Sequence, residues 1–215
     1  MKPNSEMSER NLFVMVQIFW PNGDWLSQKR YRYDPVNKRK FYQTDCSSEK
    51  MKIIWEYEGP DHYGDVWKLK KDEERKRYFI DIGYKFLRWP YYLQLTKDVA
   101  KYFFENSYTE ERYQNAITQV YGVDREEFIL SPGLHSSRRT PANYTANGVR
   151  RFMKELDEFP KSVKAQVAES LRRYIENVED KYLVIGEQDT FQDLLKTPIT
   201  KEELNIFYHH SSLKK

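Results

Sequence analysis

The sequence has little of what marks a disulfide-linked, secreted or membrane-spanning protein. Its 215 residues include a single cysteine, Cys46, which excludes a disulfide within the chain and a cysteine-rich zinc site. No apolar run approaches the roughly 18 residues that a membrane-spanning helix needs. The N-terminal segment MKPNSEMSER has no apolar core of the kind that a signal peptide requires. We therefore expect a cytoplasmic protein without a membrane partner.

Several common catalytic signatures are absent as well. The sequence has no glycine-rich phosphate loop, no GxSxG or HExxH motif, no dinucleotide-binding fingerprint and no zinc-finger spacing. Its formal net charge of +3 is small, so an anionic partner would have to meet a local basic patch. The sequence identifies neither a cofactor nor a metal.

Aromatic residues, in contrast, are abundant. They make up 16% of the chain, with 17 Tyr and 5 Trp, whereas a disordered chain carries few. A chain of this length buries roughly 70% of its unfolded surface. We therefore expect a self-sufficient core that is built largely from rings.

Polar and apolar residues alternate in several short segments of the first 95 residues, as is typical of half-buried strands. The Asn22-Gly23 pair favours a hairpin turn, and Pro90 restricts residues 84–95 to an edge or crossing segment. The alternation between residues 52 and 82 predicts an antiparallel meander with one buried face. The predicted strands span residues 12–20, 25–33, 40–43, 52–58, 66–71 and 77–82. The predicted buried face comprises Trp55, Tyr57, Trp67, Leu69, Tyr78 and Ile80.

After residue 95 the apolar period changes from 2 to 3.6, which predicts helices. Thr96 and Thr109 suit the N-cap positions of the first two. The longest helical pattern, residues 146–178, is interrupted at Pro160, which fits a first helical turn but not a helix interior. We therefore predict a helical hairpin there. Further predicted elements are helices over residues 97–105, 110–120 and 201–209 and a strand over residues 182–185.

These patterns predict an α+β fold in which an aromatic-rich antiparallel sheet, formed by residues 1–95, packs with a C-terminal group of helices. Residues 96–215 are expected to be mainly helical with one late strand. Because no clear linker separates the two regions, we expect one compact domain.

Reactive side chains are densest at the end of the predicted strand over residues 52–58 and in the turn after it. Glu56 and Glu58 lie two residues apart and so project from one face, and the turn brings His62 and Tyr63 back toward them. Such groups can bind a divalent cation or act as general acid and base. Because Asp, Gly and Pro are common in turns, an ordinary surface turn is the alternative. The candidate catalytic residues are Glu56, Glu58, His62 and Tyr63.

The same region matches the letters of one nuclease pattern. Pro60-Asp61 followed by Glu74-Arg75-Lys76 fits PD…ExK, in which the acids hold Mg²⁺. That pattern requires the ExK element on a central strand, whereas residues 74–76 fall in a predicted charged turn. The match therefore does not define a nuclease site.

Basic residues gather around a long predicted loop, residues 131–145, and on the helix after it. Arginine forks match phosphate oxygens, and a tyrosine in a basic loop can stack on a base. Arg30 and Arg32 lie on the predicted strand over residues 25–33. We expect this strand to place them beside Glu56 and Glu58. The alternative is a solvated face balanced by acids on the same helix. The candidate nucleic-acid-binding residues are Arg30, Arg32, Arg138, Arg139, Tyr144, Arg150, Arg151 and Lys154.

These features lead to two functional hypotheses. The first is a nucleic-acid-binding protein, of DNA or RNA, that contacts phosphates through the basic loop and helix. It would act as a nuclease or base-processing enzyme, such as a restriction-type protein, at residues 56–63. The second is a non-enzymatic interaction or assembly protein with a solvated charged surface. The sequence is compatible with a homodimer in either case.

Overall fold

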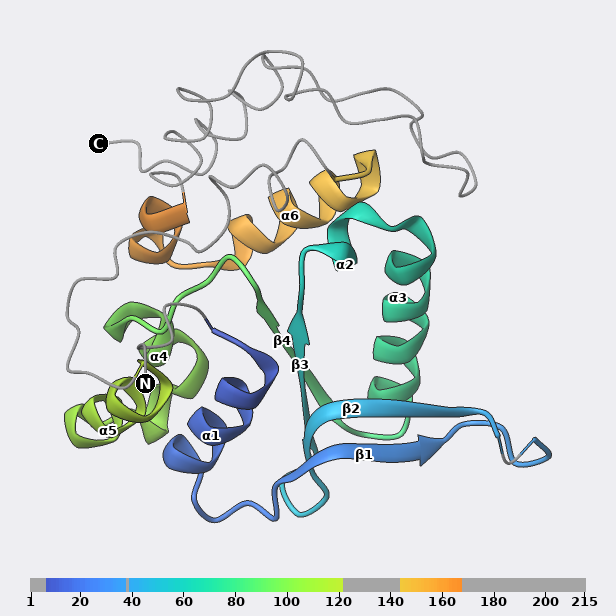
Figure 1. Cartoon of the computed structure of the whole chain (residues 1–215), viewed down its shortest axis with the longest axis horizontal. Coiled ribbons are helices and arrows are strands. Elements are labelled where there is room, and N and C mark those ends of the chain that lie inside the picture. The colour runs from blue at the N-terminus through green and yellow to red at the C-terminus, as the bar shows by residue number, and fades with distance from the viewer. Residues whose placement is uncertain (1–6, 38, 122–143, 168–215) are drawn as a thin grey trace.

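The computed structural model describes residues 7–37, 39–121 and 144–167. They form an α+β fold in which a four-stranded sheet from the N-terminal part of the chain is flanked by helices (Figure 1). The strand order is β1-β2-β3-β4. The strands β1 (Leu26–Arg32), β2 (Phe41–Ser48) and β3 (Ile53–Glu58) are antiparallel, whereas β4 (Lys85–Pro90) runs parallel to β3. The expected fold class is confirmed, and β4 is an edge strand, as Pro90 predicted.

The chain between β3 and β4 is helical, although the alternation predicted two strands there. It forms α2 (Asp61–Gly64) and α3 (Val66–Asp81), which return the chain to the start of the sheet. A parallel pair such as β3 and β4 requires a crossover of this kind. The predicted strands over residues 66–71 and 77–82 are therefore wrong.

The buried stripe of α3 explains the error. Val66, Leu69 and Phe79 lie on this stripe, but the position between them is taken by the buried acid Asp72, which interrupts the apolar pattern. Trp67 lies off the stripe and is 58% exposed, so its predicted burial is wrong. The same holds for Ile80, which lies on the exposed side of the helix.

The first element is also a helix, α1 (Glu9–Phe19), where a strand over residues 12–20 was predicted. Ser8 caps it, because its hydroxyl accepts a hydrogen bond from the backbone N–H of Asn11 at 3.2 Å. The buried residues recur at helical spacing. They are Asn11, Leu12, Met15, Val16 and Phe19. The Asn22-Gly23 turn consequently joins a helix to β1 and does not close a hairpin.

The helices after the sheet agree with their predicted positions. They are α4 (Lys97–Phe104), the short 3₁₀ helix η1 (Glu105–Ser107), α5 (Glu110–Tyr121) and α6 (Ala146–Glu158). Thr96, Thr109 and Thr145 cap α4, α5 and α6 through their hydroxyl groups. Residues 161–167 are helical, as the pattern after Pro160 predicted. The helical hairpin stays a prediction, because the rest of its second helix lies outside the described residues, as do most of the predicted loop over 131–145, the predicted strand over 182–185 and the predicted last helix.

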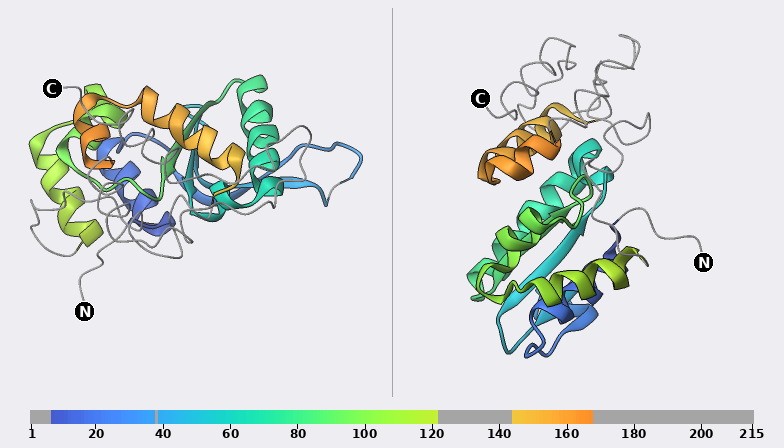
Figure 2. Two further views of the ribbon diagram at one scale, coloured as in Figure 1. Left: turned by 90° about the horizontal axis from the view of Figure 1, so that it is seen from above. Right: turned by 90° about the vertical axis from the view of Figure 1, so that its left-hand side faces the viewer.

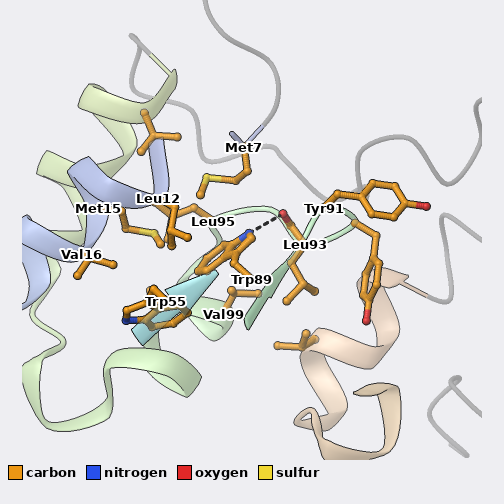
Figure 3. Packing of buried hydrophobic residues seen from close by; sticks show 14 of the residues in the cluster. Met7, Leu12, Met15, Val16, Trp55, Trp89, Tyr91, Leu93, Leu95 and Val99 are labelled. Atoms are coloured by element: carbon orange, nitrogen blue, oxygen red, sulfur yellow. Dashed lines mark hydrogen bonds between the residues drawn. The ribbon is translucent and has the colours of Figure 1, made fainter. Parts of the chain in front are cut away.

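Helices cover both faces of the sheet. Ile54 of β3 belongs to a small apolar cluster with Phe79 of α3, whereas the next residue, Trp55, stacks on Phe104 of α4. The larger core lies on the second side, where Trp55, Trp89 and residues of α1 are buried together (Figure 3). None of the helices in the described part of the chain has the length and apolar character needed to cross a membrane.

Candidate functional site

Two acids at the end of β3 are buried side by side. Glu58 has no exposed surface and Glu56 is 2% exposed. They alternate with Trp55 and Tyr57, so both project from the face of β3 that α3 covers, as the sequence predicted. Buried carboxylates are stable only where cations or hydrogen-bond donors meet them.

His62 and Asp72 meet Glu58 at this strand end. The turn after β3 leads directly into α2, which places the His62 ring over the strand. His62 Nδ1 lies 2.7 Å from Glu58 Oε2 and 2.6 Å from Asp72 Oδ2. One ligand atom from each of the three residues lies within 4.8 Å of the others. His62 therefore lies beside the end of β3, as the turn after the strand predicted.

Three arginines from separate elements neutralise the acids. Arg75 of α3 lies 2.9 Å from Glu56 Oε2, and Arg88 of β4 lies 3.1 Å from Glu58 Oε1. Arg151 of α6 contacts Glu58 Oε2 at 3.0 Å and the Asp72 carboxylate at 3.1 Å. We call the set Glu56, Glu58, His62, Asp72, Arg75, Arg88 and Arg151 the buried charge cluster.

Arg30 and Arg32 do not take part in the buried charge cluster. Both are exposed on β1, which pairs with β2 and not with β3, so they do not stand beside the glutamates as expected. Arg75, Arg88 and Arg151 fill that position instead. The sequence singled out Arg151 as a phosphate contact but did not place it, Arg75 or Arg88 beside the glutamates, because the helical crossover and the approach of α6 are long-range features of the fold.

Tyr63 anchors α6 beside the cluster. Its hydroxyl and that of Tyr92 each donate a hydrogen bond to Glu155 Oε2 at 2.7 Å, and Glu155 Oε1 accepts one from Arg151 Nε at 2.8 Å. Burial, reinforced by the Glu155 charge, raises the pKa of Tyr63 well above its ordinary value. Tyr63 therefore keeps its proton at neutral pH and orients Glu155, and the acid–base role that the sequence suggested stays a prediction.

The protonation states within the cluster differ from residue to residue. Burial alone would raise the pKa of Glu58, but the charges of Arg151, His62 and Arg88 outweigh it and hold that pKa well below its usual range. Burial opposes the charge on His62, yet its contacts with Asp72 and Glu58 raise its pKa to about 9. For Glu56, burial dominates over Arg75 and raises the pKa well above the ordinary value. The cationic neighbours therefore favour the ionised form of Glu58, whereas burial favours the neutral form of Glu56.

The donor set fits a divalent cation. Neither oxygen of Glu58 accepts a hydrogen bond of favourable geometry from the described residues, although three cationic groups lie within 3.1 Å. Two carboxylates and an imidazole are ligands that Mn²⁺, Zn²⁺ and, through the carboxylates, Mg²⁺ accept. His62 must lose its proton to bind a metal, so cation binding would compete with protonation.

A cavity of about 660 Å³ adjoins the cluster between α3, β4, α4 and α6. Its charged lining is mixed. The basic residues are Lys70, Lys76, Arg77, Arg88, Arg151 and Lys154, and the acidic ones are Glu73, Glu74, Glu155 and Glu158. A phosphate group that entered the cavity would therefore meet Arg88 and Arg151, the two arginines that also contact Glu58.

The remaining nucleic-acid candidates are separated by the fold. Arg150 and Lys154 are exposed on α6, whereas Arg151 turns inward to the cluster. Tyr144 is fully buried, and its ring stacks on Tyr63 with the centroids 4.9 Å apart, so it is not accessible to a base. Arg138 and Arg139 lie outside the described residues.

Searches of the chain against protein-family models, curated proteins and solved structures find no match. The function is therefore inferred from the geometry of the buried charge cluster and its surroundings.

Proposed function

We propose that this protein is a divalent-cation-dependent phosphodiesterase that cleaves nucleic acid at the buried charge cluster. The observation that supports it most directly is the convergence of Glu58, His62 and Asp72 within 4.8 Å of one another, next to a cavity lined by two arginines of the same cluster. This arrangement combines carboxylates for a cation with guanidinium groups for a phosphate.

Each residue has a distinct role in this proposal. Glu58, Asp72 and neutral His62 would hold the cation, which lowers the pKa of bound water and polarises a phosphoryl oxygen. Arg88 and Arg151 would bind the non-bridging phosphate oxygens and stabilise the negative charge that develops on them. Arg151 contacts the carboxylates of Glu58 and Asp72. It would therefore have to turn from Glu58 toward the cavity when a substrate binds.

The competing hypothesis is a non-enzymatic interaction protein in which the cluster only stabilises the fold. One observation favours it: each buried acid already has a cationic partner, as expected of a structural ion-pair network. In that case divalent cations would leave the melting temperature unchanged. A homodimer stays a prediction under both hypotheses.

The experiment compares wild type with Glu58→Gln and Asp72→Asn, and with Asp81→Asn as a matched control. Asp81 is an exposed acid of α3 that belongs neither to the cluster nor to the lining of the cavity, so its variant loses one negative charge away from the proposed site. Melting temperature is measured with Mg²⁺ and Mn²⁺ at pH 8, and cleavage is followed on supercoiled DNA and on RNA.

We expect cation-dependent stabilisation and cleavage in wild type and Asp81→Asn, and the loss of both in folded Glu58→Gln and Asp72→Asn. The absence of cleavage of any substrate by wild type would overturn the proposed function. Equal cleavage by all four proteins would move the site away from the cluster.

A further inference from the structure

The hairpin formed by β1 and β2 extends beyond the rest of the sheet. The two strands pair from Leu26 with Ser47 at one end to Arg32 with Phe41 at the other. β3, in contrast, pairs only with residues 46–48 of β2. The outer part of the hairpin is thus a two-stranded ribbon, and it projects to one side of the molecule (Figures 1 and 2). We call residues 29–37 and 39–44 the ribbon.

The ribbon is far more basic than the protein as a whole. The chain is close to neutral, with 36 basic and 33 acidic residues. In residues 29–42 the only acid is Asp34, which pairs with Lys40 at 3.2 Å. At the tip, Val36 is 91% exposed. The basic residues of this stretch are Lys29, Arg30, Arg32, Lys38, Arg39 and Lys40.

The two faces of the ribbon have different surroundings. Tyr31 and Tyr42 face α3, where both rings contact Phe79. The opposite face presents Arg30 and Arg32, both exposed, and among the described residues neither arginine side chain forms an ion pair. One face therefore fixes the ribbon to the protein, and the other leaves its cations available to a partner.

Arg30 is held flat on this open face. Its guanidinium carbon lies 4.5 Å from the centroid of the Phe41 ring, and its Nε donates a hydrogen bond to Gln43 Oε1 at 3.1 Å. These contacts leave the terminal nitrogens free to donate while limiting the loss of side-chain entropy on binding. Such an arginine is suited to recognise phosphate or the edge of a guanine base.

We propose that the ribbon binds double-stranded DNA by entering the major groove, with Arg30, Arg32 and Arg39 as its main contacts. The major groove of B-form DNA is about 12 Å wide and admits a two-stranded ribbon. The major groove of double-stranded RNA is too deep and narrow for side chains to read. The inference takes from the proposed function only that the partner is a nucleic acid, and it requires no cation at the cluster.

The test is fluorescence anisotropy with the full chain in EDTA, so that binding is measured without cleavage. The probes are a 20-base-pair DNA duplex and an RNA duplex of the same sequence, each at several salt concentrations. Wild type is compared with the triple variant Arg30→Gln, Arg32→Gln, Arg39→Gln and with the single variant Arg32→Gln. A control triple variant, Lys85→Gln, Lys101→Gln, Lys161→Gln, removes the same charge from exposed positions off the ribbon.

We expect the ribbon variant to bind DNA at least tenfold more weakly at about 100 mM salt. The slope of log affinity against log salt should flatten by about 0.9 per lost phosphate contact, so by up to about 2.7 for three and by about 0.9 for Arg32→Gln. The control should keep most of both affinity and slope. Wild type should bind the RNA duplex more weakly than DNA.

Equal losses in the ribbon and control variants, or equal binding of both duplexes by wild type, would overturn the inference. Its failure is distinguishable from that of the proposed function. If DNA binding depends on the ribbon but no cleavage is found, the inference about the ribbon stands and the proposed phosphodiesterase activity is overturned. If cleavage depends on the cation but the ribbon variant binds DNA as wild type does, the phosphodiesterase proposal stands and the inference about the ribbon is overturned.

Discussion

Removing the proton from His62 should destabilise the cation-free protein by about 3 kcal/mol. The pKa of His62 is about 9 in the folded protein, against 6.5 for an ordinary histidine, because Asp72 and Glu58 favour its charged form. Each tenfold change in proton affinity corresponds to about 1.4 kcal/mol, so the difference amounts to roughly 3 kcal/mol. Since the folded-state pKa is raised, this stabilisation is fully present below pH 6.5 and is lost as the pH rises through 9.

The assay is urea unfolding in EDTA, followed by tryptophan fluorescence at intervals between pH 6 and 9.5. Wild type is compared with His62→Gln, which has no imidazole to titrate but shares every other ionisable group. The free-energy difference between the two proteins should shrink by about 3 kcal/mol across this range. A difference that stays constant with pH would show that His62 is not held protonated by Glu58 and Asp72, and would refute the reasoning.

Three further substitutions test the packing, each by the change in the free energy of unfolding in urea. In Gly148→Ala the new Cβ would lie 1.8 Å from the carbonyl oxygen of Tyr63, so α6 must shift, at a cost of at least about 1–3 kcal/mol; a neutral result would contradict the close contact. Trp67→Ala should cost less than about 1 kcal/mol because Trp67 is exposed, and a loss of about 3–5 kcal/mol would instead indicate a buried ring. Tyr144→Phe removes a buried hydrogen bond to Tyr91 and should cost about 1–3 kcal/mol without weakening DNA binding, whereas weaker binding would show that Tyr144 reaches the nucleic acid.

Local patterns were sufficient wherever one residue period covered a whole element. The alternation along residues 52–58 correctly placed Glu56 and Glu58 on one face of β3, because successive residues of a strand point to opposite sides. The threonine N-caps located the starts of α4 and α5 for an equally local reason, since a cap bonds within its own first turn.

Sequence patterns predicted the wrong element where the burial of a residue depends on partners far away in the sequence. In α3 a buried Asp72 takes the place of an apolar residue, and its burial is intelligible only once Arg75 and Arg151 lie beside it. In α1 a nearly continuous apolar run fits a strand as well as a helix, so tertiary packing decides. The arginines of the cluster come from α3, β4 and α6, and no spacing in the sequence relates them to Glu58.

Helix α3 contacts both the buried charge cluster and the ribbon, the two parts of the protein that we propose to act on nucleic acid. Asp72 faces the buried acids, and Tyr78, six residues later, donates a hydrogen bond to the carbonyl oxygen of Arg32 in the ribbon at 3.1 Å. At about 1.5 Å per residue, these two positions are about 9 Å apart along the helix axis. Arg75 lies between them and also donates to the carbonyl oxygen of Gln43 at 3.4 Å. Because these contacts to the ribbon use backbone oxygens, substitutions on its open face can change DNA binding while the geometry of the cluster stays intact.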